Sequence, residues 1–273
     1  MTDLLKIEWL KIKNYTAFKV MTIFFVAGVF ALNYIVYIFN RDVINKTQAG
    51  ALISFNPYTF DNTWQSTSYA TGNILLLPAL LLLMLFTNEY TFKTHRQNII
   101  DGLSRQQFMG VKIMLAAIFA LASSLIVVIC ALVFGFASGT SFSVHGIQFL
   151  GFFFLKALSY NLIAILFSVI VKRTGFAIGI FFIYLGSENI ISQLLNVLSM
   201  KIKKDSGTDL GNIGDYLPMN AADALLEFPD NPIKTMSKAI MPTDYTWVVF
   251  ALAISYLAIF YYWSRRKFIH ADL

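Results

Sequence analysis

The side chains of this chain that could do chemistry are few and scattered. His95, His145 and His270 fall on three different segments, and the only cysteine, Cys130, lies in an apolar run. The sequence contains no GxxxxGK[ST] phosphate loop, no HExxH pair, no assignable Ser–His–Asp set and no pair of carboxylates within an apolar run. We therefore expect no enzyme activity, and no catalytic, cofactor-binding or metal site on this chain.

A few polar residues lie inside apolar runs, where an ionisable group is costly unless it faces a partner or water. Glu188, Asn189 and Gln193 share one run, and Lys156 lies in another. The first three could line a translocation path or a dimer interface. The alternative is an interhelical hydrogen bond for Glu188 and a Lys156 stem that reaches toward the membrane surface.

The stretch 88–112 is polar and rich in turn signals, and it separates two apolar runs. Asp101-Gly102 is a strong turn dipeptide, and Ser104 with Gln107 fits a capping box that starts the next helix. Upstream, residues 89–100 can continue the preceding span as a helix. We predict a projecting hairpin that docks in a soluble partner, the alternative being a solvated basic loop. Its expected exposed residues are Glu89, Lys93, His95, Arg96, Asp101 and Arg105.

The composition is that of a membrane protein. The chain is 57% hydrophobic and 13% charged, and its mean hydropathy is +0.64, whereas a soluble domain has about 25% charged residues. The net charge of +6 is not a nucleic-acid signal, because Lys and Arg mark the cytoplasmic ends of membrane spans. We therefore expect an all-α protein whose partner is the lipid bilayer, with no nucleic acid bound.

Six apolar runs are long enough to cross a bilayer. They cover residues 17–39, 69–87, 113–137, 147–171, 175–198 and 245–263. Pro78 predicts a kink in the second span, and residues 40–68 are predicted to form a non-cytoplasmic loop. Six spans place both termini on one side. Thirteen Lys and Arg residues lie on the side of the termini and the hairpin, against seven on the other, so the positive-inside rule makes both termini cytoplasmic.

Two further segments complete a single transmembrane domain over residues 1–273. In residues 1–16, Leu5, Trp9 and Ile12 recur at helical spacing and predict an interfacial helix. The polar segment 199–245 is expected outside the cytoplasm, with short helices starting at Asn220 and after Asn231-Pro232. An ordinary solvated loop is the alternative for this segment.

The hairpin resembles the pattern after span 2 in permease subunits of the ABC-2 type of ABC transporters: a Glu, a G/K-T-x-R step, then S-R and a Lys before the next span. The residues that carry the resemblance are Glu89, Thr94, Arg96, Ser104-Arg105 and Lys112. This chain has Lys93 where the family often has Gly, and Gly102-Leu103 where Pro is common. The six spans, the N-terminal helix and the long last loop also fit.

The resemblance implies an exporter-like fold in the inner membrane of a prokaryote. Two six-span subunits would form a homodimer or a heterodimer, and each would dock one ATP-hydrolysing subunit, which binds the ATP and Mg²⁺. The N-terminal helix and the hairpin would receive that subunit. The residues implied in coupling are Glu89, Lys93, Thr94, Arg96, Asp101, Ser104 and Arg105.

Two other functions compete with this one. A membrane sensor or assembly subunit would need no ATPase, so a neighbouring gene for a P-loop ATPase would favour the transporter. A secondary transporter or channel would show paired broken spans with charges in corresponding positions, whereas only one span here contains a proline.

Overall fold

The computed structural model describes residues 2–44, 55–230 and 242–270, and this part of the chain is helical with no strand. The expected helix after Asn231-Pro232 lies outside the described residues. The helices are α1 (Thr2–Lys13), α2 (Thr16–Ile38), η1 (Phe39–Ile44), α4 (Phe60–Gly72), α5 (Leu76–Thr91), α6 (Thr94–Ile100), α7 (Arg105–Ala137), α8 (Gln148–Val171), α9 (Thr174–Ser206), η2 (Ile213–Tyr216), α10 (Asn220–Ala224) and α12 (Thr246–Ile269).

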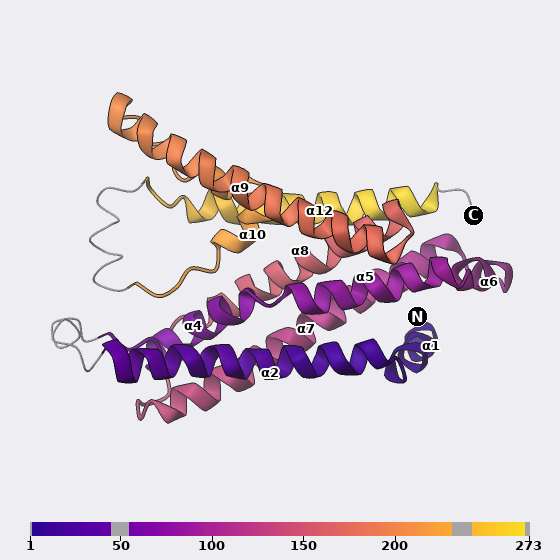
Figure 1. Cartoon of the computed structure of the whole chain (residues 1–273), viewed down its shortest axis with the longest axis horizontal. Coiled ribbons are helices and arrows are strands. Elements are labelled where there is room, and N and C mark those ends of the chain that lie inside the picture. The colour runs from indigo at the N-terminus through magenta and orange to yellow at the C-terminus, as the bar shows by residue number, and fades with distance from the viewer. Residues whose placement is uncertain (1, 45–54, 231–241, 271–273) are drawn as a thin grey trace.

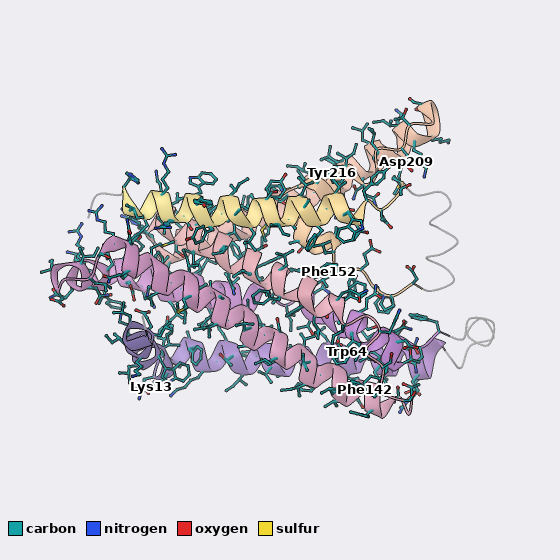
Figure 2. All side chains as sticks on the ribbon, turned by 180° about the vertical axis from the view of Figure 1, so that it is seen from behind. Lys13, Trp64, Phe142, Phe152, Asp209 and Tyr216 are labelled. Carbon is teal, nitrogen blue, oxygen red and sulfur yellow. The ribbon has the colours of Figure 1, made fainter. Side chains whose placement is uncertain are left out.

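The long helices run roughly side by side as one bundle (Figure 1). Among the described residues, five helices are long and apolar enough to cross a membrane, and the bent pair α4–α5 makes up to six. α1, α6 and the end of α12 share one end of the bundle (Figure 1). Figure 2 shows Lys13 at that end and Trp64 and Phe142 at the other. The expected all-helical, multi-span architecture is confirmed.

α8 is the central helix of the bundle. Of its most apolar stretch, 61% is buried inside the protein, compared with 17% for α2, α9 and α12. It packs against α5, α7 and α12, and its fully buried residues include Phe153 and Ile165. The surrounding helices therefore expose apolar faces outward, as expected for a bundle immersed in lipid.

The second span is broken, and the break accounts for the kink predicted at Pro78. α4 and α5 meet at an angle of 45°. Pro78 lies in the first turn of α5 and has no N–H to bond to Ile74 O, and in a straight helix its ring would clash with that carbonyl. The chain therefore bends one turn before the proline, at residues 73–75.

The loop expected over residues 40–68 is wrong for much of its length, because η1 extends α2 and α4 begins at Phe60. The residues of α4 are rich in Ser and Thr and do not look like a buried helix. However, Thr63 and Thr67 are fully buried, and each hydroxyl bonds to the carbonyl four residues earlier at 2.7 Å. These two hydroxyl groups thus find their hydrogen-bond partners in the backbone of their own helical turns.

The polar segment expected over 199–245 is shorter than predicted, since α9 continues to Ser206. The short helix expected at Asn220 is present as α10, preceded by η2. α10 packs against α8, α9 and α12.

The contact between α4 and α7 depends on a glycine. A Cβ on Gly135 would lie 2.7 Å from the ring of Phe60, which is 1% exposed and contacts the ring of Phe136. We expect Gly135→Ala to lower the apparent melting temperature in detergent, because overpacking costs about 1–3 kcal/mol.

Gly151→Ala in α8 is the matched control. Its Cβ would meet nothing within 4 Å, so the better helix propensity of alanine should leave stability equal or slightly higher. Equal melting temperatures for the two variants would contradict the packing argument.

Candidate functional site

The hairpin between α5 and α7 is shaped by a backbone break and a capped helix start. Lys93 has a left-handed conformation with φ 57°, which ends α5 and redirects the chain before α6. The predicted continuous helix over 89–100 is therefore wrong. The turn at Asp101-Gly102 is confirmed, with φ 103° at the glycine. The capping box is also present, since Ser104 Oγ accepts from Gln107 N at 3.2 Å and Gln107 Oε1 accepts from Ser104 N at 3.1 Å.

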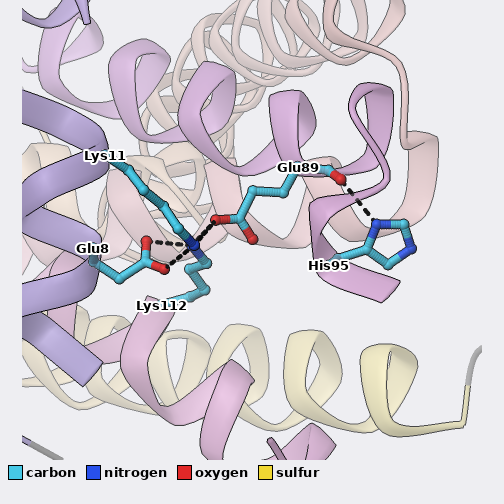
Figure 3. Close-up of polar contacts among 5 residues, drawn as sticks. All are labelled: Glu8, Lys11, Glu89, His95 and Lys112. Atoms are coloured by element: carbon cyan, nitrogen blue, oxygen red, sulfur yellow. Dashed lines mark hydrogen bonds and ion pairs between the residues drawn. The ribbon is translucent and has the colours of Figure 1, made fainter. Parts of the chain in front are cut away.

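Four charged side chains from three helices meet at the base of the hairpin (Figure 3). The ammonium group of Lys112, in α7, lies 2.5 Å from Glu8 Oε2 in α1 and 2.7 Å from Glu89 Oε1 in α5. Lys11 lies 2.9 Å from Glu8 Oε1 and 3.2 Å from Glu89 Oε1. We call these four residues the charge cluster. Its two positive and two negative charges balance, and they join α1 to the ends of α5 and α7.

The neighbours within the charge cluster favour the ionised forms of Glu8 and Lys11. Burial alone would raise the pKa of Glu8, but Lys112 and Lys11 outweigh this effect and hold the pKa below its usual value. Burial would likewise lower the pKa of Lys11, and the carboxylates of Glu89 and Glu8 raise it instead. Lys112 is 3% exposed, and its ammonium group also lies 5.2 Å from the ring centre of Phe108.

Two residues expected on the exposed surface of the hairpin are buried. Glu89 is 7% exposed and His95 is 8% exposed. Glu89 turns inward to meet Lys112, and the break at Lys93 folds His95 back so that its Nδ1 lies 2.9 Å from Glu89 O (Figure 3). The His95 ring also packs on Tyr90, with centroids 4.6 Å apart.

The other residues implied in coupling lie at the surface or tie the hairpin to the bundle. Arg105 is half-buried, and its Nη1 donates a 2.6 Å hydrogen bond to Ile269 O at the end of α12. Lys93, Thr94, Arg96, Asp101 and Ser104 are exposed. Some of these residues therefore hold the hairpin against the bundle, and the others lie on its exposed surface.

A groove of about 570 Å³ runs between α1 and the hairpin. Leu4 and Ile7 line it from α1, Leu103 from the turn, and Phe108 and Val111 from α7, while Glu8 and Lys11 of the charge cluster reach its wall. The groove is open to the surface, and both apolar and charged side chains line it. It could receive a side chain or a short segment of another protein.

The resemblance assigned α1 to the docking of a partner together with the hairpin, but sequence reasoning missed that charged side chains of α1 hold the base of the hairpin. It counted Lys11 only as a topology signal, and it did not single out Glu8. The available signals were the Glu8–Lys11 spacing of three residues and Lys112, a charge placed at the start of an apolar run. Of the predicted apolar stripe of α1, Ile12 is 1% exposed whereas Trp9 is 55% exposed, so the buried face of α1 combines Ile12 with Glu8.

The second predicted set does not form one group. Glu188 is 6% exposed and accepts hydrogen bonds from the backbone N–H and the side-chain amide of Asn220, at 3.0 and 3.2 Å. Asn189 and Gln193 lie on the exposed face of α9. Among the described residues, no group of three or more His, Cys, Asp or Glu side chains could hold a metal ion.

The charge cluster makes a stability prediction. Replacing Lys112 with Met leaves the carboxylates of Glu8 and Glu89 facing each other with only Lys11 between them. Because removing one partner of a buried ion pair costs about 3 kcal/mol or more, we expect the apparent melting temperature to fall by about 5 °C or more. Lys13→Met is the matched control on the exposed end of α1, and an equal effect of both variants would contradict the prediction.

A pH prediction comes from Asp215 in η2, whose pKa is raised to about 6 by burial and by the nearby carboxylates of Asp244 and Glu227. The folded state therefore binds this proton more tightly than the unfolded state does, and the resulting stabilisation is lost as the pH rises through about 6. We expect the melting temperature of Asp215→Asn to change less between pH 5 and pH 7.5 than that of the parent, as measured by thermal unfolding in one detergent. Identical pH profiles would disprove this assignment.

A comparison with known protein families matches most of the chain. A family model described as ABC-2 family transporter protein matches residues 4–187, which run from α1 through the hairpin into α9. No curated protein matches the chain. The matched region is more than half of the 273 residues, and the chain belongs to the ABC-2 family of transporter membrane proteins.

Proposed function

We propose that this chain is the permease subunit of an ABC exporter, and that a separate ATP-hydrolysing subunit docks on the hairpin end of the bundle and drives it. The observation that carries the proposal is the presence of large apolar side chains on a polar hairpin. Phe92 is 73% exposed and Ile100 is 76% exposed. Exposed apolar groups rimmed by charges are typical of a protein-binding surface.

The docking surface combines the groove with the charges beside it. Lys93, Arg96 and Asp101 are exposed around the apolar residues of α6, and they supply the polar rim of an interface. Glu89 and Arg105 act from behind this surface, Glu89 through the charge cluster and Arg105 through α12. The ATPase would thus contact a surface whose shape is fixed by contacts to several spans.

The proposed orientation follows from the distribution of Lys and Arg. The end that carries α1, the hairpin and the end of α12 would face the cytoplasm of a prokaryote, with the chain in the inner membrane. ATP and Mg²⁺ would bind to the ATPase, of which a complete transporter contains two copies. Segment 199–245 would lie at the outer side.

A second permease subunit, identical or different, would pack against α9. Only 17% of the most apolar stretch of α9 is buried within this chain. Its outer face carries Asn189 and Gln193 among Ile190, Leu194 and Val197. Polar side chains within an apolar helix face are suited to hydrogen bonds across a membrane interface.

The docking proposal is tested with the double variant Arg96→Glu/Ile100→Glu, which changes only exposed side chains of α6. We expect it to reach the membrane at the parent level but to lose co-purification with the ATPase, and the ATPase should no longer be stimulated by cargo. Arg96→Glu reverses a charge, and Ile100→Glu places a new charge where an apolar side chain would be buried. Together these changes at an interface cost several kcal/mol.

The matched control is Val144→Glu, at an exposed site in the loop at the other end of the bundle. It should retain ATPase binding. Full ATPase binding by the α6 double variant would overturn the proposed docking surface.

A further inference from the structure

The short helix α10 lies inside the bundle although it contains only five residues. Ala221 and Ala222 are fully buried, and Met219 just before the helix is 1% exposed. In Figure 1, α10 lies between α9, α12 and α8, and contacts to all three confirm this position. A helix this short cannot hold itself in place, so its contacts to the spans must position it.

The start of α10 is held by Glu188 of α9. One oxygen of this carboxylate accepts hydrogen bonds from Met219 N at 2.5 Å, Asn220 N at 3.0 Å and Asn220 Nδ2 at 3.2 Å. Two of these donors are backbone groups that a helix start leaves without internal partners. Three charge-assisted hydrogen bonds to a buried carboxylate form a strong and water-excluded contact.

The other end of α10 is held by Lys156 of α8. Its ammonium group lies 3.2 Å from Asp223 Oδ1, and Tyr160 OH donates to Asp223 Oδ2 at 3.1 Å. The side chain of Lys156 is 9% exposed, whereas that of Asp223 is 26% exposed. Asp223 Oδ1 is itself buried and accepts no hydrogen bond, so this ion pair lacks the hydrogen bonds that hold Glu188 and is the weaker of the two contacts.

Lys156 also touches the broken span. A Cβ on Gly72, the last residue of α4, would lie 3.1 Å from the Lys156 ammonium nitrogen. Gly72 thus lets the ammonium group pack closely against the backbone, directly before the bend between α4 and α5. A change in that bend would therefore move the surroundings of the ammonium group that holds Asp223.

From these contacts we infer that Lys156 and Glu188 are positioning residues for transport. Glu188 is the fixed anchor of α10, and the Lys156–Asp223 ion pair is a releasable contact that opens when the bend of the second span changes. The inference rests on the proposed function, in which ATP-driven movement of the spans changes the outer part of the bundle. It gives Lys156 of α8 and Glu188 of α9 separate mechanical roles.

Thiol labelling of α10 tests the inference. The parent for this test is Cys130→Ala with Ala222→Cys, reconstituted in nanodiscs and labelled with a charged maleimide. Cys130 is the only native cysteine. We expect Lys156→Met to raise the labelling rate of Ala222→Cys at least tenfold. Lys156→Arg keeps the positive charge and should label within about twofold of the parent rate. The double variant Lys156→Asp/Asp223→Lys exchanges the two charges and should again label slowly. These measurements need no ATPase.

The outcomes separate this inference from the proposed function. Slow labelling in Lys156→Met would overturn it, and Asp223→Asn gives the same test from the other partner if Lys156→Met does not fold. With the ATPase bound, ATP should raise labelling in the parent, and Lys156→Met should label fast with or without ATP. If ATP leaves the labelling rate of an active parent complex unchanged, the inference is also overturned. Failure to bind any ATPase would contradict only the proposed function.

Discussion

The cost of burying charge at the membrane boundary organises the hairpin end of this protein. A buried ammonium or carboxylate group without a partner costs several kcal/mol. Lys112 is almost completely buried at the start of an apolar span, so it requires Glu8 and Glu89, and these require Lys11. The three helices that carry these residues must therefore come together as one unit. The charge cluster thus specifies the position of α1, which few apolar contacts could fix alone.

The same constraint acts in the other half of the bundle with a different result. Lys156 and Glu188 each face a polar group of α10 rather than another long span. Each charge therefore places a short segment against a long helix, as Lys112 does for α1. The two contacts differ in hydrogen bonding, because Lys112 donates to both Glu8 and Glu89 whereas Asp223 Oδ1 accepts no hydrogen bond. An ion pair without hydrogen bonds is easier to exchange during a movement, which fits a hairpin end that moves as one unit and an α10 that can be released at one end.

The sequence predicts the elements whose signals are local. Hydropathy locates the spans, Pro78 the bend, Asp101-Gly102 the turn and Ser104 the helix start. It fails where tertiary contacts override local preference. α4 is rich in Ser and Thr, and its burial depends on hydroxyl groups that bond to their own backbone. The burial of Glu89 and the role of Glu8 depend on residues that are distant in the sequence, so no local pattern reveals them.

The contacts of the hairpin explain how a force applied at its surface could reach the spans. α6 itself is only seven residues long and follows a left-handed residue, so it can transmit a displacement only through what it touches. His95 connects it to the end of α5, the charge cluster connects α5 to α1 and α7, and Arg105 connects α7 to α12. A push on α6 therefore acts on four helices together. Because α5 continues into the bend beside Lys156, the same push reaches the outer half of the bundle through the broken span.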